Sequence, residues 1–105
     1  MVVSQFDVVL VNLDPTVGSE CKKTRPCVVV SPSDMNRNLN TVIVAPMTST
    51  IRGWAFRPIV TGKNKSELML DQIRAVDKSR LVKVVGSIKQ KERPPIKSVL
   101  SDMFS

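Results

Sequence analysis

The chain has 105 residues, and its 16 lysines and arginines outnumber its 9 aspartates and glutamates, which gives a formal charge of +7. This length fits a single domain over residues 1–105, and the excess of positive charge favours a polyanionic partner. The sequence has no apolar run of ~18 residues and no charged leader with a cleavage site, so neither a membrane partner nor a signal peptide is expected.

Short runs rich in β-branched residues make up most of the chain. The second predicted strand is an unbroken apolar run, which indicates burial on both faces. The fifth is interrupted by Asp71-Gln72, as a β-bulge would interrupt it. Strands are predicted over residues 7–13, 26–31, 41–46, 54–60, 67–76 and 81–88.

Two segments carry helical signals. Residues 33–38 predict a helical turn or a loop, with Ser33 or Asp34 as its N-terminal cap. Pro94-Pro95 suit a helix start, and apolar residues then recur with the period of an amphipathic helix at Ile96, Val99, Leu100, Met103 and Phe104. Short strands followed by one helix predict a mainly β fold, a small and partly open β-barrel with a C-terminal helix.

The chain contains two cysteines, Cys21 and Cys27, and no histidine. Two cysteines are too few for a disulfide framework, which fits a reducing cytoplasm, and without histidine their spacing predicts no zinc site. The carboxylates are scattered, so neither a two-metal site nor a cofactor is expected. Because the chain has no histidine, any chemistry on phosphate must run without an imidazole acid or base. Cys27 lies among valines and is predicted to be a core residue.

Arg25 and Thr48 are the first candidates for phosphate chemistry. Arg25 follows a polar loop at the start of a predicted strand, and its planar fork of donors matches phosphate oxygens. Thr48 and Ser49 follow the end of the strand predicted over residues 41–46, where a hydroxyl can donate to phosphate or orient a 2′-hydroxyl. Taken alone, Arg25 is better explained by a surface ion pair with Glu20, and Thr48 by local turn chemistry.

The polar loop before Arg25 offers Ser19, Glu20, Lys22 and Lys23. Glu20 lies among cations that should lower its pKa, so it suits a general base only weakly; it could instead bind a base edge or clamp Arg25. Lys22 and Lys23 either steer phosphates or belong to a solvated loop. Asp71-Gln72 could read base edges, or could be a bulge with outward side chains. Aromatic residues are few, which argues against a stacking platform.

A set of short segments runs along nearly the whole chain: Leu13-Asp14-Pro15-Thr16, Gly18-Ser19-Glu20, Thr24-Arg25-Pro26, Val44-Ala45-Pro46-Met47-Thr48-Ser49 and Leu70-Asp71-Gln72-Ile73-Arg74-Ala75-Val76-Asp77 with Arg80-Leu81. In this order they resemble the MazF/PemK toxins of bacterial toxin–antitoxin systems. The resemblance implies an SH3-like, partly open barrel of the PemK type and a homodimer. It also implies a metal-independent endoribonuclease that cuts single-stranded RNA at a short sequence, leaves 2′,3′-cyclic phosphate and 5′-hydroxyl ends, and inhibits translation.

The resemblance assigns roles to individual positions. Arg25 matches the catalytic arginine and Thr48 the catalytic threonine of the family, and Glu20 would take the 2′-hydroxyl proton or position Arg25. Enzymes of the Kid type carry a histidine where Ser19 stands and an arginine where Met69 stands, so their acid–base assignment, which uses the aspartate matching Asp71, does not carry over. The RNA-binding set is Ser19, Lys22, Lys23, Thr24, Ser49, Asp71 and Gln72.

The family also implies a cognate antitoxin whose acidic C-terminal tail covers the RNA groove, as a basic groove would favour. Two other functions remain open. A non-catalytic RNA-binding module needs only the basic charge. A gyrase poison of the CcdB type would share the barrel, but its C-terminal Trp-Gly-Ile is absent, because this chain ends Asp102-Met103-Phe104-Ser105.

Overall fold

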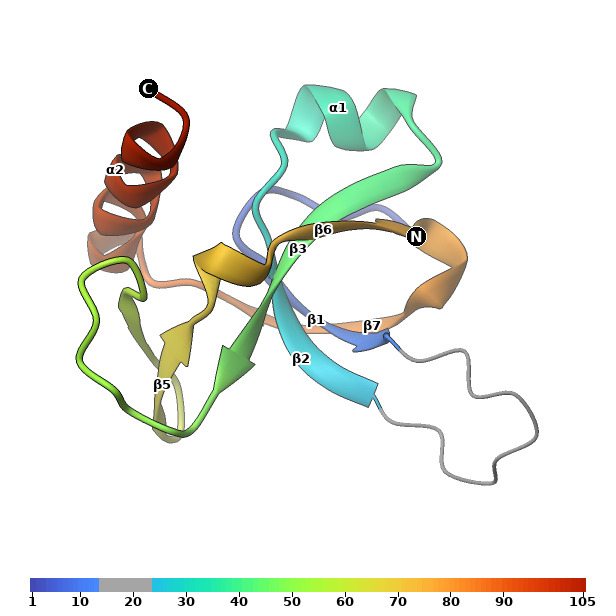
Figure 1. Cartoon of the computed structure of the whole chain (residues 1–105). Helices are drawn as coiled ribbons and strands as arrows, with labels where there is room; N and C mark the ends of the chain where they lie inside the picture. The colour runs from blue at the N-terminus through green and yellow to red at the C-terminus, as the bar shows by residue number, and fades with distance from the viewer. Residues whose placement is uncertain (14–23) are drawn as a thin grey trace.

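A computed structural model describes residues 1–13 and 24–105, in which one bent sheet is flanked by helices (Figure 1). The helices are α1 (Ser33–Asn38) and α2 (Arg93–Met103). The strands are β1 (Asp7–Asn12), β2 (Thr24–Val29), β3 (Thr41–Thr48), β4 (Ile59–Thr61), β5 (Lys65–Leu68), β6 (Arg74–Asp77) and β7 (Leu81–Ser87).

Within the described residues the strands form one sheet in the order β4-β5-β3-β2-β1-β7, and β6 pairs with β3 outside this path. Every pair of hydrogen-bonded strands among the described residues is antiparallel. The path runs from β4 to β7 without closing, so the sheet is a partly open barrel. The predicted class, mainly β with a C-terminal helix, is confirmed.

The core has two parts because successive side chains of a strand point to opposite faces. Cys27 and Val29 of β2 pack with Val9 and Val11 of β1 on one face. Val28 packs on the other face, in the cluster that includes Leu68 of β5 and Ile96 of α2. The strand is therefore buried on both faces over its second half, as its apolar run predicts.

Cys27 is fully buried, as predicted. Burial raises the pKa of its thiol to about 11, against weaker opposing effects of Arg25 and Arg74. A thiol with so high a pKa carries almost no thiolate at neutral pH, so Cys27 is an inert core residue.

The interrupted strand at residues 67–76 is two strands, β5 and β6, that pair with successive parts of β3. Met47 and Thr48 of β3 face β5, and Thr41 to Val44 face β6. A 3₁₀ turn at Leu70–Gln72 separates the two strands. The strand is interrupted at Asp71-Gln72, as predicted, but the interruption is a 3₁₀ turn and not a β-bulge.

The strand predicted over residues 54–60 is wrong for most of its length, because β4 begins only at Ile59. Gly53 adopts φ +77°, and the Arg57 amide donates to the carbonyl of Trp54 at 3.0 Å, so the chain turns here. Pro58 lies just before β4. A left-handed glycine followed by a closed turn prevents the extended backbone that the apolar pattern suggests.

The predicted cap of α1 is also wrong. Pro32 occupies the N-cap position, and no side chain caps the helix there. Asp34 instead contacts Arg37 at 2.5 Å, three residues later on the helix surface. In the part of the chain that is described, no helix is both long and apolar enough to cross a membrane.

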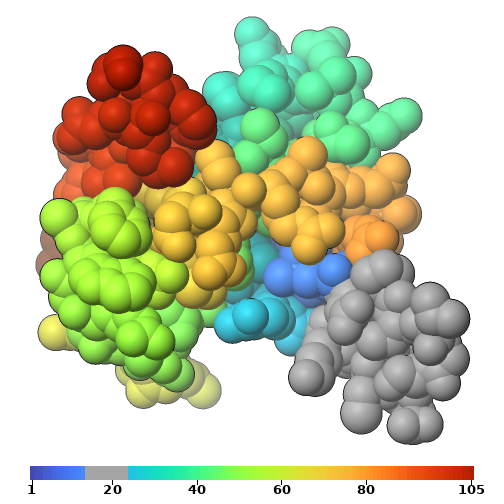
Figure 2. Space-filling view, in the orientation of Figure 1, coloured from blue at the N-terminus to red at the C-terminus, as the bar shows by residue number. Residues whose placement is uncertain are grey.

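The amphipathic stripe of α2 is confirmed at its beginning and exposed at its end. Ile96 is fully buried and Val99 and Leu100 are partly buried against the core. Met103 and Phe104 are 38% and 73% exposed. Figure 2 shows α2 (red) beside the yellow-green surface of the segment that precedes β4, and a cavity of about 280 Å³ between them is lined by Phe56, Val99 and Met103 among others.

Candidate functional site

Arg25 is an exposed side chain at the second position of β2. It pairs with Val11 of β1, and Thr24, also exposed, pairs with Asn12. Pro26 follows Arg25 and biases it toward the extended conformation of the strand. The guanidinium is therefore carried by a backbone that pairing with β1 holds in place.

Thr48 is the last residue of β3, the neighbour of β2 in the sheet. The ladder between these strands ends with Cys27 opposite Pro46, so Arg25 and Thr48 each lie two residues beyond the last recorded pair. The recorded pairing stops at Cys27, and beyond it the two strands spread apart (Figure 1). Pro26 and Pro46 lack the amide hydrogens that a continued ladder would use.

The Thr48 hydroxyl takes part in a local turn, as the simpler interpretation of this residue predicts. Its Oγ1 accepts a hydrogen bond from the Thr50 amide at 3.1 Å. This contact uses an oxygen lone pair and leaves the hydroxyl hydrogen able to donate to a phosphate oxygen. Ser49 follows as an exposed residue.

The predicted site residues Ser19, Glu20, Lys22 and Lys23 lie outside the described residues. The described residues before this segment end at Leu13, and those after it begin at Thr24. Arg80 Nη1 donates to the carbonyl oxygens of Asn12 at 3.3 Å and Leu13 at 3.5 Å. Arg80 thus ties the end of β1, opposite Thr24, to the turn before β7.

Glu67 of β5 stands opposite Thr48 in the register between β3 and β5. Its side chain is fully buried, and Oε2 accepts hydrogen bonds from the amides of Arg52 and Gly53, both at 2.8 Å. A buried carboxylate that binds two amides holds the segment after Thr48 in one conformation. Sequence reasoning missed this residue, because a glutamate inside a strand pattern carries no sign of its burial.

Asp71 forms an ion pair with Arg57. The Arg57 Nε lies 2.9 Å from Oδ1, and Nη2 lies 3.0 Å from Oδ2, so both carboxylate oxygens are engaged. The hydrogen bond from Arg57 is the main reason that the pKa of Asp71 lies below its ordinary value of 3.8. Asp71 is therefore a carboxylate at neutral pH and cannot act as a general acid there.

Trp54 and Phe56 form an aromatic pair that sequence reasoning did not anticipate. Their ring centroids are 5.4 Å apart at an interplanar angle of 24°, and each residue is 43% exposed. The guanidinium carbons of Arg52 and Arg57 lie 5.2 and 4.7 Å from the Trp54 ring centroid. We call Arg52, Trp54, Phe56 and Arg57 the aromatic platform.

Each end of the aromatic platform is anchored near Thr48. Glu67 binds the backbone at Arg52, and Asp71 binds the side chain of Arg57. The 3₁₀ turn that carries Asp71 and the exposed Gln72 is joined to β3 by the Met69 amide, which donates to the Pro46 carbonyl at 2.9 Å. The low number of aromatic residues argues against a stacking platform, yet two of them stack on each other in one loop and are each 43% exposed.

These residues offer groups that suit an anion and, in a separate segment, an exposed aromatic pair. Arg25 provides a permanent positive charge and Thr48 a hydroxyl donor on adjacent strands, and the aromatic platform follows Thr48 in sequence. Among residues 1–13 and 24–105, no three Cys, Asp or Glu side chains gather in a group that could hold a metal ion.

Comparison with known proteins connects this geometry to a family. The model of the PemK-like, MazF-like toxins of type II toxin–antitoxin systems matches residues 4–104. The endoribonuclease toxin MazF of Escherichia coli K12 is 32% identical over 71 residues, which are 67% of this chain and 64% of that protein. The endoribonuclease EndoA of Bacillus subtilis is 36% identical over 88 residues, 77% of this chain and 76% of that protein. The chain thus spans slightly less than two thirds of the E. coli protein.

Solved structures share the fold. A MazE–MazF complex from Deinococcus radiodurans matches with a TM-score of 0.82 and 21% identity, covering 98% of this chain and 96% of that chain. The Mycobacterium tuberculosis toxin MazF-mt6 matches with a TM-score of 0.77 and 20% identity over 93% and 95% of the two chains. Because the family model covers almost the entire sequence, this chain belongs to the PemK-like, MazF-like toxin family of type II toxin–antitoxin systems.

Proposed function

We propose that this protein is the toxin of a toxin–antitoxin pair and acts as a metal-independent endoribonuclease on single-stranded RNA. The observation that supports the proposal is that Arg25 and Thr48 lie on neighbouring strands, each two residues beyond the last recorded pair, Cys27 opposite Pro46. The two curated relatives at 32% and 36% identity are named endoribonucleases, which supports the same activity.

The proposed reaction is a transesterification within the RNA. The substrate 2′-oxygen forms a bond to the adjacent phosphorus as the bond from phosphorus to the 5′-oxygen breaks, so that a 2′,3′-cyclic phosphate and a 5′-hydroxyl result. The 2′-hydroxyl proton passes to a base and the 5′-oxygen gains a proton. Because the nucleophile belongs to the substrate, alignment and charge stabilisation supply most of the catalysis.

Arg25 and Thr48 have separate roles in this reaction. Arg25 stabilises the negative charge that grows on the non-bridging oxygens, because its fork of donors matches them and its charge is permanent. Thr48 donates to the scissile phosphate and holds it in line. Glu20, which precedes β2 in the sequence, takes the 2′-hydroxyl proton or positions Arg25. An arginine is a poor acid at neutral pH, so water is the better proton donor for the leaving oxygen.

The aromatic platform and its anchors bind the nucleobases that flank the scissile phosphate. A base that stacks on an aromatic side chain gains about 1–3 kcal/mol, and arginine adds a cation–π contribution. Asp71 holds Arg57 against Trp54 and so acts as a positioning residue. Gln72, Ser49 and Thr24 are exposed and add hydrogen-bonding groups. Lys22, Lys23 and Ser19 complete the RNA-binding set.

A cognate antitoxin and a second copy of the chain are the proposed protein partners. A basic, RNA-binding surface attracts an acidic antitoxin tail for the same electrostatic reason that it attracts RNA. The D. radiodurans structures that share the fold include MazE–MazF complexes, which supports such a partner. The protein acts in the cytoplasm, where messenger RNA and the antitoxin are present.

The test is incubation of the purified protein with a long, unstructured RNA in EDTA, followed by mapping of both new ends. We expect cuts at one short sequence, with a 5′-hydroxyl and a 2′,3′-cyclic phosphate at each cut. Loss of cutting in EDTA that returns with a divalent metal would contradict the metal-independent mechanism. An RNA that is bound and left intact would favour the second function, a non-catalytic RNA-binding module.

A further inference from the structure

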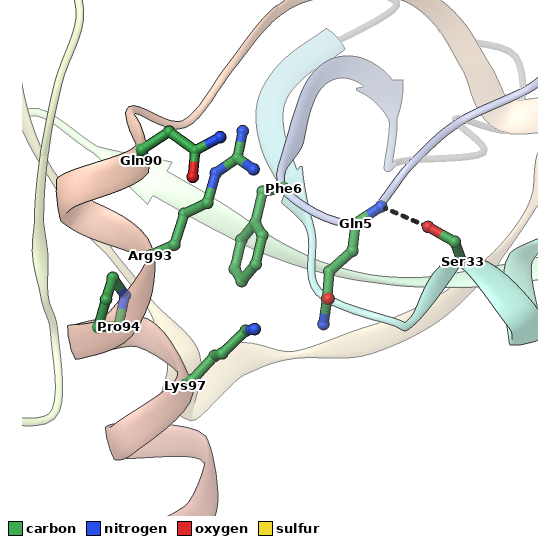
Figure 3. Close-up of a pocket in the computed structure, with 7 residues that line it drawn as sticks. All are labelled: Gln5, Phe6, Ser33, Gln90, Arg93, Pro94 and Lys97. Carbon is green, nitrogen blue, oxygen red and sulfur yellow. Dashed lines mark hydrogen bonds between the residues drawn. The ribbon is translucent and has the colours of Figure 1, made fainter.

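A polar pocket lies at the start of β1, lined by none of the residues assigned to cleavage. It has a volume of about 400 Å³ and opens between the segment before β1 and the beginning of α2 (Figure 3). Its lining residues are Gln5, Phe6, Ser33, Gln90, Arg93, Pro94 and Lys97. Two of these are cations and none carries a carboxylate, so the pocket is suited to an anion.

The two cations reach the same ring from one face of α2. The Arg93 guanidinium carbon lies 5.3 Å and the Lys97 Nζ 5.7 Å from the centroid of Phe6. Figure 3 shows both side chains directed from the helix toward that ring. Like charges four residues apart on a helix repel each other, and an anion bound beside them would remove this repulsion.

Neutral donors border the same space. The Arg93 Nε donates to the Ile88 carbonyl at 2.9 Å, which orients the guanidinium and leaves its two Nη nitrogens as further donors. The Ser33 hydroxyl oxygen accepts from the Gln5 amide at 3.5 Å, so its hydrogen can point elsewhere. The side-chain amide of Gln90 adds donors at the rim. The planar guanidinium of Arg93, the ammonium group of Lys97 and the neutral donors together match the oxygens of a phosphate.

The backbone at the floor of the pocket is held in an unusual conformation. Phe6 has φ +74°, a region that a bulky L-residue rarely adopts. Hydrogen bonds fix it there: the Phe6 amide donates to Val29 at 2.7 Å, and the Ile88 amide donates to the Phe6 carbonyl at 2.9 Å. Strain that the surrounding structure maintains at a polar pocket supports a binding role for it.

We propose that this pocket binds a phosphate group, and that its source is the backbone of the RNA strand beyond the cleaved bond. The second part rests on the proposed endoribonuclease function. Phe6 directly precedes β1, and Val11, five residues later, pairs with Arg25. At ~3.3 Å per strand residue, the backbone path along β1 from Phe6 to Val11 is about 17 Å long, a length that several nucleotides of one RNA strand span. The pocket would therefore bind flanking RNA and leave the cleaved sequence to the other site.

Titration with inorganic phosphate, followed by NMR of the backbone amides, tests the pocket without RNA. We expect shifts at Gln5, Ser33 and Gln90 in the wild-type protein and in the control Lys63→Glu, which makes the same charge change at an exposed lysine between β4 and β5. Lys97→Glu should abolish these shifts. Equal shifts in Lys97→Glu and Lys63→Glu would overturn the phosphate site.

Two RNAs with a 2′-deoxy nucleotide at the scissile position, which blocks cleavage, test the source of the phosphate. One covers only the cleaved sequence, and the other adds unstructured flanks on both sides. We expect Lys97→Glu to lower the preference for the flanked RNA by about tenfold and to reduce the salt dependence of its binding by about 0.7 in the log–log slope, whereas Lys63→Glu should not. An unchanged preference in Lys97→Glu would overturn the RNA assignment.

Arg93→Lys is a further variant that checks for a folding artefact, because it keeps the positive charge and removes only the planar guanidinium with its several donors. Its thermal unfolding should match that of the wild-type protein within a few degrees, and its phosphate affinity should lie between those of the wild-type protein and Lys97→Glu. If the wild-type protein cuts no RNA, the proposed function fails, while the phosphate titration still decides whether the pocket binds an anion.

Discussion

Arg57 and Asp71 form a two-point ion pair that joins the loop before β4 to the 3₁₀ turn between β5 and β6, with contacts of 2.9 and 3.0 Å. The Arg57 side chain is only 8% exposed. The same guanidinium covers the Trp54 ring at 4.7 Å. The ion pair therefore sets the orientation of the only tryptophan in the chain.

Replacing Asp71 should disturb the aromatic platform and leave the fold intact. Asp71→Asn removes the charge that holds Arg57, so Trp54 should become more mobile and more exposed to water. We expect a red shift of its fluorescence and RNA binding that is several times weaker. Asp102→Asn, which removes an exposed carboxylate on α2, is the matched control. Wild-type fluorescence and affinity in Asp71→Asn would contradict the positioning role.

The ion pair also predicts how Trp54 responds to acid. The folded pKa of Asp71 is lowered from 3.8, so the stabilisation that it provides is fully present above that value and is lost as pH falls through the lowered pKa. Trp54 fluorescence should therefore remain constant from neutral pH down to 3.8 and change only below it. Asp71→Asn should lack this acid step. A transition above pH 3.8 in the wild-type protein would contradict the lowered pKa.

Trp54→Ala should weaken RNA binding more than it weakens the fold. Loss of one stacked base removes about 1–3 kcal/mol of binding free energy, or roughly 5- to 150-fold in affinity. Phe104→Ala removes another exposed aromatic side chain at the C-terminal end and should have little effect on RNA binding. Fluorescence anisotropy of a labelled, non-cleavable RNA measures both. Equal affinities for the two variants would remove the aromatic platform from the RNA site.

Glu67→Ala should destabilise the protein, because it leaves the amides of Arg52 and Gly53 without the carboxylate that accepts from them. The expected loss in the free energy of unfolding is about 1–3 kcal/mol. Glu67→Gln keeps one acceptor oxygen and a similar shape, so its loss should be smaller. Urea unfolding curves compare the two variants. A larger loss for Glu67→Gln would show that these hydrogen bonds do not carry the effect.

The Cys27 thiol should resist modification in the folded protein. Burial raises its pKa to about 11, and the side chain has no exposed surface. In a Cys21→Ser background, a thiol reagent should label the protein only after a denaturant is added. Labelling at neutral pH without denaturant, at the rate of a free thiol, would contradict the buried position.

The sequence predicts the parts of this fold that depend on local periodicity. Alternation and apolar runs give β1, β2, β3 and β7 to within a few residues, and the apolar stripe from Ile96 onward gives α2. The aromatic pattern of residues 54–60 misleads, because Gly53 at positive φ and the Arg57–Asp71 pair fold that segment into a turn. Contacts between residues so far apart leave no mark in a local pattern.

The candidate site divides in the same way. Residue types and the family resemblance predict Arg25 and Thr48 as site residues, whereas the pairing of their two strands, β2 and β3, is something that periodicity alone does not give. Glu67 and the Trp54–Phe56 stack were missed because each depends on a partner in another segment. Ser19, Glu20, Lys22 and Lys23 stay predictions, because they lie outside the described residues.

Arg25 carries the central step of the proposed reaction, so the most direct measurement is the rate of RNA cleavage by Arg25→Ala. The control is Arg37→Ala, which removes another exposed arginine, on α1. Circular dichroism should show that both variants are folded. We expect Arg37→Ala to cut RNA at the wild-type rate and Arg25→Ala to lose cleavage by at least about 100-fold while it still binds the RNA. Cleavage by folded Arg25→Ala at the wild-type rate would contradict the proposed mechanism.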